Sequence, residues 1–392
     1  MPSPTPRGAR PLLLSLLLAG ACAPAAPARG PAPLATPELA FRPALEPARP
    51  ERPEIEARID EILASPVLRD PEFAEAVQGW VEYWREDVAS AMPAFLERMA
   101  VFQALVDSAL VEHDLPPSLC YLPFIESGYN PLALSRASAV GMWQFMRTTA
   151  TGLGMEVTPL LDQRRDPVRS TEAAIRYLSS LRTELGSWFL ALAAYNGGPN
   201  RVRRVLARYA PGVEPSDSLF WALRHHFPRE TRDFVPKLIG AALVAGDPAA
   251  HGFEAPAADR FAFDVVRVPD ATTLDVVARA AGTSLEEIER LNPEYVKGIT
   301  PAGRTSVLRV PEGRGPAFTA AYALIPPDER VTFVEHRVAP GETLSHIARR
   351  YGVRVADIQA ANPRVRPRYL RIGASIVVPI APRADRALQA GG

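Results

Sequence analysis

The sequence predicts a mainly α-helical domain followed by two small α+β modules, and three observations lead to this fold class. From Glu54 to about residue 246, apolar residues recur among charged ones at helical spacing, with Gly and Pro as breaks. Beyond His251 the composition changes to short β-branched runs beside helices. The last third of the chain also repeats itself, with Leu274 matched by Leu344 at an offset of 70 residues.

The charge balance of the chain argues against nucleic acid as a partner. The 392 residues hold 44 Lys and Arg against 44 Asp and Glu, so the formal net charge is zero. Such a chain has no general electrostatic attraction for a polyanion. We therefore expect a neutral polysaccharide or a small molecule as the ligand. The sequence does not specify an oligomeric state.

Residues 1–21 are typical of a secretory signal peptide. Positive charge at Arg7 and Arg10 precedes an apolar run over 12–18 and a few small residues. The run is too short for a membrane-spanning helix, which needs about 20 apolar residues. A Pro/Ala-rich stretch over 22–53 then predicts an extended tether.

Cys22 directly follows the small residues that end this signal. The arrangement resembles the lipobox of bacterial lipoproteins, which implies a lipid anchor on Cys22. Ala23 follows the cysteine, and by the same resemblance this favours the periplasmic side of the outer membrane. Ala19 stands where those signals more often have Leu, so secretion to the periplasm stays as the alternative.

The helical region divides into an N-terminal scaffold over 54–115 and a domain over 116–246. Within the domain, Asp166-Pro167 is predicted to open a helix, because Asp is a favoured N-cap and Pro is favoured in the first turn. Gly197-Gly198-Pro199 is predicted to end the next helix.

The repeated segments span 262–312 and 334–380. In each, four apolar residues share one helical face, a glycine follows, and a strand-like run ends in proline. The matched faces are Leu274, Val277, Ala278 and Ala281 in the first copy and Leu344, Ile347, Ala348 and Tyr351 in the second. Two short helices between two strands, a βααβ unit, is the expected structure of each copy.

A carboxylate in an apolar setting is the first candidate for chemistry. Glu126 directly follows Phe124 and Ile125 and precedes Gly128 by two residues. A glutamate taken alone is usually a solvated surface charge. At the edge of a buried surface, however, desolvation disfavours the ionised form and raises the pKa. A carboxyl that stays protonated near neutral pH can donate a proton to a leaving oxygen.

Two further clusters follow along the chain. The first, residues 139–146, has the character of a helix core except at Gln144, a polar residue that requires hydrogen-bond partners if it is buried. A bound sugar could supply them. The second, residues 191–198, contains Tyr195 and Asn196 and has the pattern of a helix end with an Asn/Gly cap.

In this order and spacing, the three clusters resemble the catalytic domain of lytic transglycosylases. The matching elements are Glu126-Ser127, the run from Gly141 to Met146 and the run from Ala194 to Gly198. The resemblance implies a mainly α fold of the lysozyme-like, goose type. Together with the C-terminal modules it points to the membrane-bound D type of these enzymes.

The second repeat resembles the lysin motif (LysM), a βααβ module that binds glycans containing N-acetylglucosamine. The match rests on Gly341-Glu342-Thr343-Leu344, on Asn362 and on Val377-Val378-Pro379. The first repeat has Ala271-Thr272 in place of the Gly-Glu pair, which makes it a degenerate member. Sugar binding and a spacer role both stay open for the first repeat.

The resemblance also implies roles for single residues. Glu126 would be the only catalytic acid and base, and Ser135 and Gln144 would contact the sugar and its acetamido group. Tyr195 would lie beside the glutamate and help place its proton, while Asn196 would contact the substrate or only cap a helix.

The implied reaction cleaves peptidoglycan between N-acetylmuramic acid and N-acetylglucosamine and closes a 1,6-anhydro ring. No water is consumed, so the second carboxylate of two-carboxylate glycosidases is not required. Two alternatives stay open: a hydrolase (muramidase) on the same fold, and a non-catalytic wall-binding protein.

Several other residues are assigned structural roles. Asp162 and Asp166, considered as candidates for a second carboxylate, are expected to be turn and cap residues. Cys120 lies in an apolar segment and is expected to be a small buried residue. The chain has no H-E-x-x-H, no Cys/His metal spacing and no phosphate-binding glycine loop, so no metal or cofactor is expected.

Overall fold

The computed structural model describes residues 60–254, 257–362, 365–366 and 370–380. The predicted signal peptide and tether lie outside these residues, and so does the predicted anchor site Cys22. Within the described part, no helix combines the length and apolar character that crossing a membrane requires.

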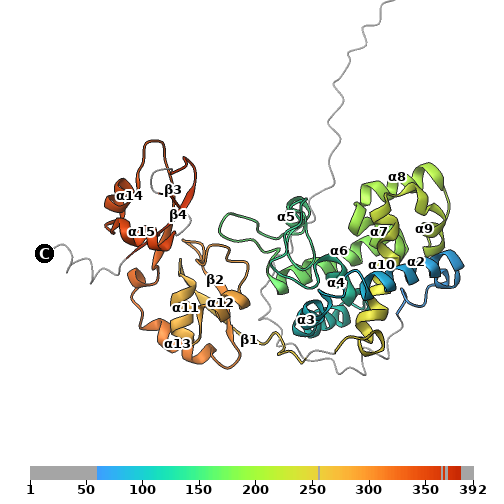
Figure 1. The fold of residues 1–392 in the computed structure, drawn as a ribbon, viewed down its shortest axis with the longest axis horizontal. Helices are drawn as coiled ribbons and strands as arrows, with labels where there is room; N and C mark the ends of the chain where they lie inside the picture. The colour runs from blue at the N-terminus through green and yellow to red at the C-terminus, as the bar shows by residue number, and fades with distance from the viewer. Residues whose placement is uncertain (1–59, 255–256, 363–364, 367–369, 381–392) are drawn as a thin grey trace, which may run out of the picture. The chain divides into compact units, whose positions relative to one another are not determined.

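Helices account for most of the structure from Pro71 to Gly246 (Figure 1). One of the shortest, α4, carries Glu126. The helices are α2 (Pro71–Arg85), α3 (Met92–Glu112), α4 (Leu122–Ser127), α5 (Arg147–Gly152), α6 (Pro167–Leu185), α7 (Trp188–Gly197), α8 (Pro199–Tyr209), α9 (Asp217–Leu223) and α10 (Arg229–Gly246). Short 3₁₀ helices over Pro66–Arg69, Pro117–Tyr121 and Arg224–His226 connect some of them.

Local sequence signals set where these helices begin and end. Asp166 accepts hydrogen bonds from the backbone amides of Val168 and Arg169, so it caps α6 as predicted. Gly186 ends the same helix in the left-handed conformation at φ 66°. The predicted break at 197–199 is also confirmed, because α7 ends at Gly197 and α8 begins at Pro199.

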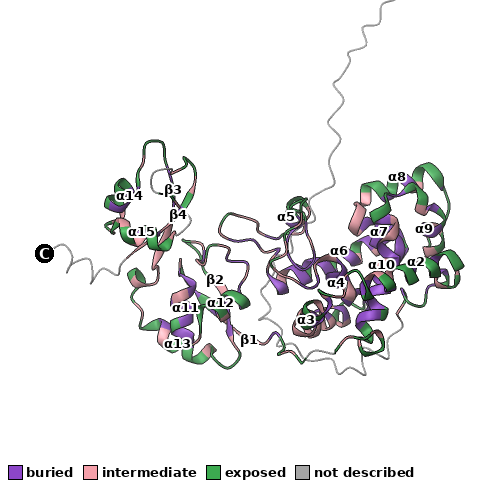
Figure 2. Ribbon diagram, in the orientation of Figure 1, coloured by how far each residue is buried: buried purple, intermediate pink, exposed green. Residues whose placement is uncertain are grey.

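A hydrophobic core runs through the helical domain and is seen as the purple segments of its helices in Figure 2. α7 is its most buried helix, with every residue from Trp188 to Ala194 buried. α10 packs against both α2 and α7. Cys120 is buried in this core, as predicted. The core therefore holds rigidly the helices on which the candidate site is built.

Two stretches predicted to be helical are turns. Residues 61–64 form a turn rather than a helix, because Pro66 disfavours the α conformation at Ser65, where ψ is 132°. Residues 141–144, in the cluster with helix-core character, form a turn as well. Gln144 there has a φ of 49°, in the left-handed region that a right-handed helix excludes.

Each C-terminal repeat is a βααβ unit with one antiparallel pair of strands, as predicted. The first unit consists of β1 (Phe263–Val268), α11 (Leu274–Ala281), α12 (Leu285–Leu291) and β2 (Ser306–Pro311), and the second of β3 (Phe333–Arg337), α14 (Leu344–Tyr351), α15 (Val355–Ala361) and β4 (Ser375–Pro379). A further helix, α13 (Gly315–Ala323), follows the first unit and packs on α11.

The repeat extends to individual hydrogen bonds. Asn292 donates to the carbonyl of Arg309 at 2.7 Å and accepts from its amide at 2.7 Å, which ties the end of α12 to β2. Asn362 makes the same two bonds to Val377, at 2.6 and 2.9 Å. The two units therefore match residue by residue, with Arg309 in the place of Val377.

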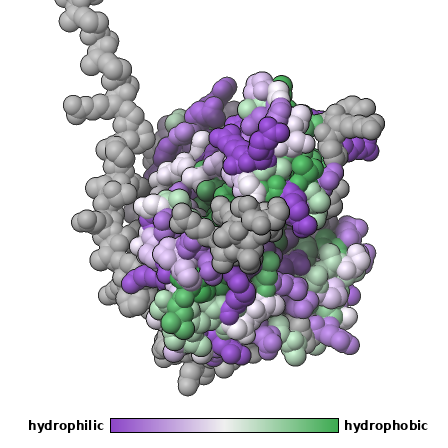
Figure 3. Space-filling model, turned by 90° about the vertical axis from the view of Figure 1, so that its left-hand side faces the viewer, coloured by the Kyte–Doolittle hydropathy of each residue, from purple (hydrophilic) through white to green (hydrophobic). Residues whose placement is uncertain are grey.

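Hydrophilic and hydrophobic residues are interspersed on the face shown in Figure 3. The large hydrophobic residues that are exposed come from distant parts of the described chain, and the most exposed are Leu324 at 84% and Ile372 at 67%. Single exposed apolar residues are normal on a folded protein. They do not by themselves mark a binding surface.

Candidate active site

Glu126 lies near the end of α4, where the apolar residues before it are deeply buried. Leu122 and Phe124 are 0% exposed and Ile125 is 6% exposed, while Glu126 itself is half-buried. Gly128 then turns the chain at φ 58°, and a Cβ at this position would lie 2.5 Å from the Phe95 ring. The close approach and the left-handed backbone require glycine here.

The surroundings of Glu126 favour a protonated carboxyl. Burial raises the pKa of Glu126 from 4.5 to about 7. The positive charge of Lys237 opposes this change, and the negative charge of Glu230 adds to it. The carboxyl is therefore divided between its acid and base forms near neutral pH, as a group that acts first as acid and then as base requires.

Lys237 of α10 is held beside the glutamate by several contacts. Its Nζ donates to the carbonyl of Ile125 at 2.9 Å and lies 5.8 and 5.6 Å from the ring centroids of Trp80 and Trp84. Desolvation lowers the pKa of Lys237, and the charge of Glu126 opposes that effect. Sequence reasoning gave neither Lys237 nor Glu230 a role. Only the folded chain brings α10 to α4.

Tyr195 of α7 has its hydroxyl proton committed to another partner. The hydroxyl donates to the carbonyl of Trp143 at 2.7 Å. Burial is the main cause that raises the pKa of Tyr195, and the charge of Glu126 is the next. Tyr195 is thus close enough to Glu126 for an electrostatic effect, while its hydrogen bond fixes the chain just before Gln144.

Ser135 and Gln144 lie on one loop, residues 134–146, which we call the Gln144 loop. Bridges from Val140 to both Leu134 and Phe145 fold the loop back on itself. The Ser135 hydroxyl accepts from the amide of Ala139 at 2.9 Å, and the Gln144 side chain donates to the carbonyl of Gly141 at 2.8 Å. Each side chain is half-buried.

Ser127 connects the Gln144 loop to the helix of the glutamate. Its hydroxyl donates to the carbonyl of Met142 at 2.9 Å. The structure thus brings together Glu126, Tyr195 and the loop of Ser135 and Gln144, which are distant in sequence.

Asn196 joins two helices rather than capping one. Its Oδ1 accepts from the hydroxyl of Thr231 at 2.8 Å, and its Nδ2 donates to Glu230 at 3.4 Å. The cap alternative is wrong, because α7 continues to Gly197 and the side chain bonds across to α10.

Asp162 and Asp166 are not among the charges that act on Glu126. Asp162 pairs with Arg164 at 2.8 Å, and Asp166 caps α6. Their predicted turn and cap roles are correct but incomplete, because Asp166 also pairs with Arg309 of the first C-terminal unit at 2.6 Å.

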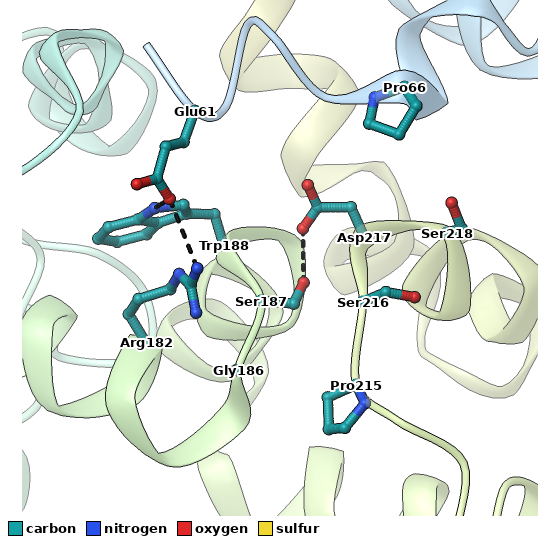
Figure 4. Close-up of a pocket in the computed structure, with 10 residues that line it drawn as sticks. All are labelled: Glu61, Pro66, Arg182, Gly186, Ser187, Trp188, Pro215, Ser216, Asp217 and Ser218. Atoms are coloured by element: carbon teal, nitrogen blue, oxygen red, sulfur yellow. Dashed lines mark hydrogen bonds and ion pairs between the residues drawn. The ribbon is translucent and has the colours of Figure 1, made fainter. Parts of the chain in front are cut away.

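A pocket of about 260 Å³ lies elsewhere in the helical domain (Figure 4). Several of its polar groups bond one another: Trp188 donates to Glu61 at 2.8 Å, Arg182 pairs with the same carboxylate at 3.5 Å, and Ser187 donates to Asp217 at 2.5 Å. These bonds hold the start of α7 in place. We therefore assign the pocket a structural role and place the candidate active site at Glu126.

Known domain families match the chain in three places. Residues 107–212 match the transglycosylase SLT domain, residues 262–327 match the LysM-like domain of lytic transglycosylase MltD, and residues 336–379 match the LysM domain. The mainly helical domain with its half-buried glutamate and the two βααβ units thus define an SLT-domain protein with LysM modules. The predicted fold class is confirmed.

Membrane-bound lytic murein transglycosylase D is among the proteins that the chain resembles, as the sequence predicted. The Escherichia coli protein of that name is 29% identical over 289 residues, which are 70% of this chain and 62% of the relative. The chain therefore spans less than two thirds of that relative's length. The peptidoglycan transglycosylase gp16 of Escherichia phage T7 is 35% identical over 104 residues, 26% of this chain and 8% of its own. Among solved structures, the 70 kDa soluble lytic transglycosylase of Escherichia coli covers 47% of this chain and 30% of its own, at 23% identity and a TM-score of 0.34.

Proposed function

We propose that this chain is a lytic transglycosylase that cleaves the glycan strands of peptidoglycan. One observation carries the proposal: a half-buried glutamate whose pKa lies at about 7, within an SLT domain. The LysM modules further along the chain support a glycan of the cell wall as the substrate. The names of both relatives agree with this substrate class.

In the proposed reaction, protonated Glu126 donates its proton to the glycosidic oxygen between N-acetylmuramic acid and N-acetylglucosamine. The bond from that oxygen to the muramic C1 breaks, and the carboxylate so formed is stabilised by Lys237. The Glu126 carboxylate then accepts the proton of the C6 hydroxyl while the C6 oxygen bonds to C1. Proton and electron pairs balance without water, and Glu126 returns to its starting form.

Ser135, Gln144, Tyr195 and Asn196 are proposed to support this reaction, the first two by contacting the substrate and the last two by holding the site together. The amide and hydroxyl on the Gln144 loop would bond the sugar and its acetamido group. Tyr195 would maintain the loop through Trp143, and Asn196 would hold α7 against α10, the helix that bears Lys237.

The mass of the products distinguishes this function from its alternatives. A lytic transglycosylase leaves a 1,6-anhydro end, which is lighter by one water than the reducing end that a hydrolase leaves. We expect purified protein on purified peptidoglycan to release only anhydro products. Reducing ends would make the chain a muramidase, and binding without any cleavage would make it a wall-binding protein.

The activity is expected to fall as the pH rises through about 7, because the free enzyme needs Glu126 protonated. Replacing Lys237 with Met removes the charge that lowers the pKa of Glu126, so this alkaline limb should move to higher pH. Glu230→Gln should move it to lower pH, because Glu230 raises the same pKa. Profiles of kcat/KM against pH test both signs, with Lys237→Arg as the charge-conserving control. Two variants that move the limb in the same direction would contradict the assignment.

The second LysM module, residues 336–379, is proposed to retain the enzyme on the wall. A chain that ends after Thr332 keeps Arg330 and Thr332 against the first module, where they bond Thr273 and Asp275 at 2.9 Å each. We expect this chain to sediment poorly with insoluble peptidoglycan, since loss of the second LysM module reduces the number of sites that bind the wall at once. Cleavage of short soluble glycans should be nearly unchanged. Sedimentation equal to that of the full chain would remove the anchoring role.

A lipid anchor at Cys22, with the protein on the periplasmic side of the outer membrane, is part of the same proposal. It rests on the sequence pattern and on the membrane-bound relative. An unmodified N-terminal peptide, measured by mass, would favour secretion to the periplasm instead.

A further inference from the structure

Three buried ionisable side chains join the first LysM-like module to the helical domain. Arg309 on β2 contacts Asp166 at 2.6 Å through Nη2 and Glu294 at 3.0 Å through Nη1. The residues are 8%, 4% and 3% exposed, in that order. Removing one partner of a buried pair leaves the other without compensation, so loss of Arg309 should strongly disturb this contact.

Backbone hydrogen bonds extend the contact. The amide of Asp162 donates to the carbonyl of Glu294 at 2.9 Å, and the amide of Val296 donates to the carbonyl of Leu160 at 3.1 Å. Between them, Leu161 is 5% exposed and belongs to the hydrophobic core of the module. A segment of the helical domain is thus built into the module.

The same segment holds the Gln144 loop. The guanidinium of Arg164 bonds both carboxylate oxygens of Asp162, through Nε at 2.9 Å and Nη2 at 2.8 Å. Its Nη1 donates to the carbonyls of Ser138 and Phe145, each at 3.2 Å. Both carbonyls belong to the loop, so a shift of Asp162 would shift the loop with it.

We propose that the first LysM-like module is a fixed part of the catalytic unit, and that Arg309 and Glu294 are positioning residues for the Gln144 loop. The inference rests on the proposed function, in which this loop contacts the glycan. This inference gives the degenerate module a role other than sugar binding or spacing. The module contacts the segment 156–166 of the helical domain, and that segment in turn holds the Gln144 loop.

The second module supports this division of roles. Its core is built from its own residues, from Val338 to Val378. At the position of Arg309 it has Val377, which bonds the matching asparagine in the same way. A shared fold therefore carries a docking arginine in one copy and an apolar residue in the other.

The test compares full-length Arg309→Met with the parent by hydrogen exchange of residues 134–146 and by kcat and KM on a soluble glycan. Exchange in the loop should be faster by about 2- to 30-fold, the range for mutations that modulate coupling between sites. kcat/KM should fall by up to about 100-fold, because small misplacements of substrate-positioning groups are costly. Arg309→Lys should recover part of both losses.

Arg290→Met is the control for loss of an arginine pair within the module, at a more exposed position than Arg309. Arg290 makes an equally close two-bond pair with Glu287, at 2.8 and 2.7 Å, but both residues belong to α12 of the same module. This variant should leave loop exchange and kinetics as in the parent. The same changes in both variants would reduce the effect to general destabilisation and overturn the proposal.

Two further readouts keep the test decisive. If Arg309→Met does not fold, Arg304→Met serves instead, because it removes only the exposed pair with Glu156 at the same interface. Hydrogen exchange in the Gln144 loop should also be faster in this variant than in the parent. Unchanged loop exchange in that variant and in Arg309→Lys would overturn the bracing role. Hydrogen exchange does not require turnover, so the two proposals can fail separately. If the parent is inactive but the variants change loop exchange, the enzyme assignment is rejected and the positioning role of the module stands. If the parent is active but the variants leave loop exchange unchanged, the positioning role is rejected and the enzyme assignment stands.

Discussion

Glu126→Gln is expected to abolish turnover while the fold and glycan binding remain. The amide keeps the shape of the side chain but cannot donate the proton that the leaving oxygen needs. General acid–base catalysis contributes roughly 10²- to 10⁴-fold, so kcat should fall by at least about 100-fold. Release of anhydro products from peptidoglycan is the measurement, and circular dichroism checks the fold. Activity within about threefold of the parent would reject Glu126 as the acid.

The same variant is expected to be more stable than the parent at high pH. The pKa of this carboxyl rises from 4.5 to about 7 on folding. Its contribution to the free energy of unfolding is therefore complete below pH 4.5 and is lost as the pH rises through 7. Above pH 7 the ionised glutamate therefore costs up to about 3 kcal/mol, which glutamine avoids. Urea unfolding at pH 4 and pH 8 should show a gain only at pH 8. An equal gain at both would mean that the carboxyl is not desolvated.

Gly141→Ala is expected to cost on the order of 3 kcal/mol or more in unfolding free energy, and most of the activity. Gly141 has a φ of 85°, and a Cβ there would lie 1.8 Å from the carbonyl oxygen of Arg164. Neither group can yield easily, because the guanidinium of the same arginine ties its segment to the Gln144 loop at Ser138 and Phe145. Urea unfolding and kcat/KM measure the two effects.

Gly154→Ala is the matched control for that clash. Gly154 has the same φ of 85°, but a Cβ there meets nothing within 4 Å. Only the left-handed backbone is penalised, by about 1–2 kcal/mol. Equal losses in the two variants would show that contact with Arg164 is not what requires glycine at position 141.

Much of this molecule follows from local sequence signals. The α6 start at Asp166-Pro167, the end of α7 at Gly197 and both βααβ repeats depend on caps, breakers and periodicity, all of which act within a few residues. Glu126 could be singled out because it directly follows a run of apolar residues, and these residues are buried in the structure. The turn at 141–144 could not be predicted in the same way. The carbonyls of Met142 and Trp143 in this turn accept hydrogen bonds from the distant Ser127 and Tyr195, while the local pattern is that of a helix core.

The charges around Glu126 and the role of the first module depend on long-range packing. Lys237 lies 111 residues from Glu126 in sequence, and only the packing of α10 against α4 brings its charge there. Asp166 has the local pattern of a helix cap. The sequence around it does not predict its pairing with Arg309, which lies 143 residues away. The residues that form a helix or a turn are chosen by short-range geometry. The partner of a buried charge is chosen by which surfaces meet when the chain folds, and that information is spread over the whole sequence.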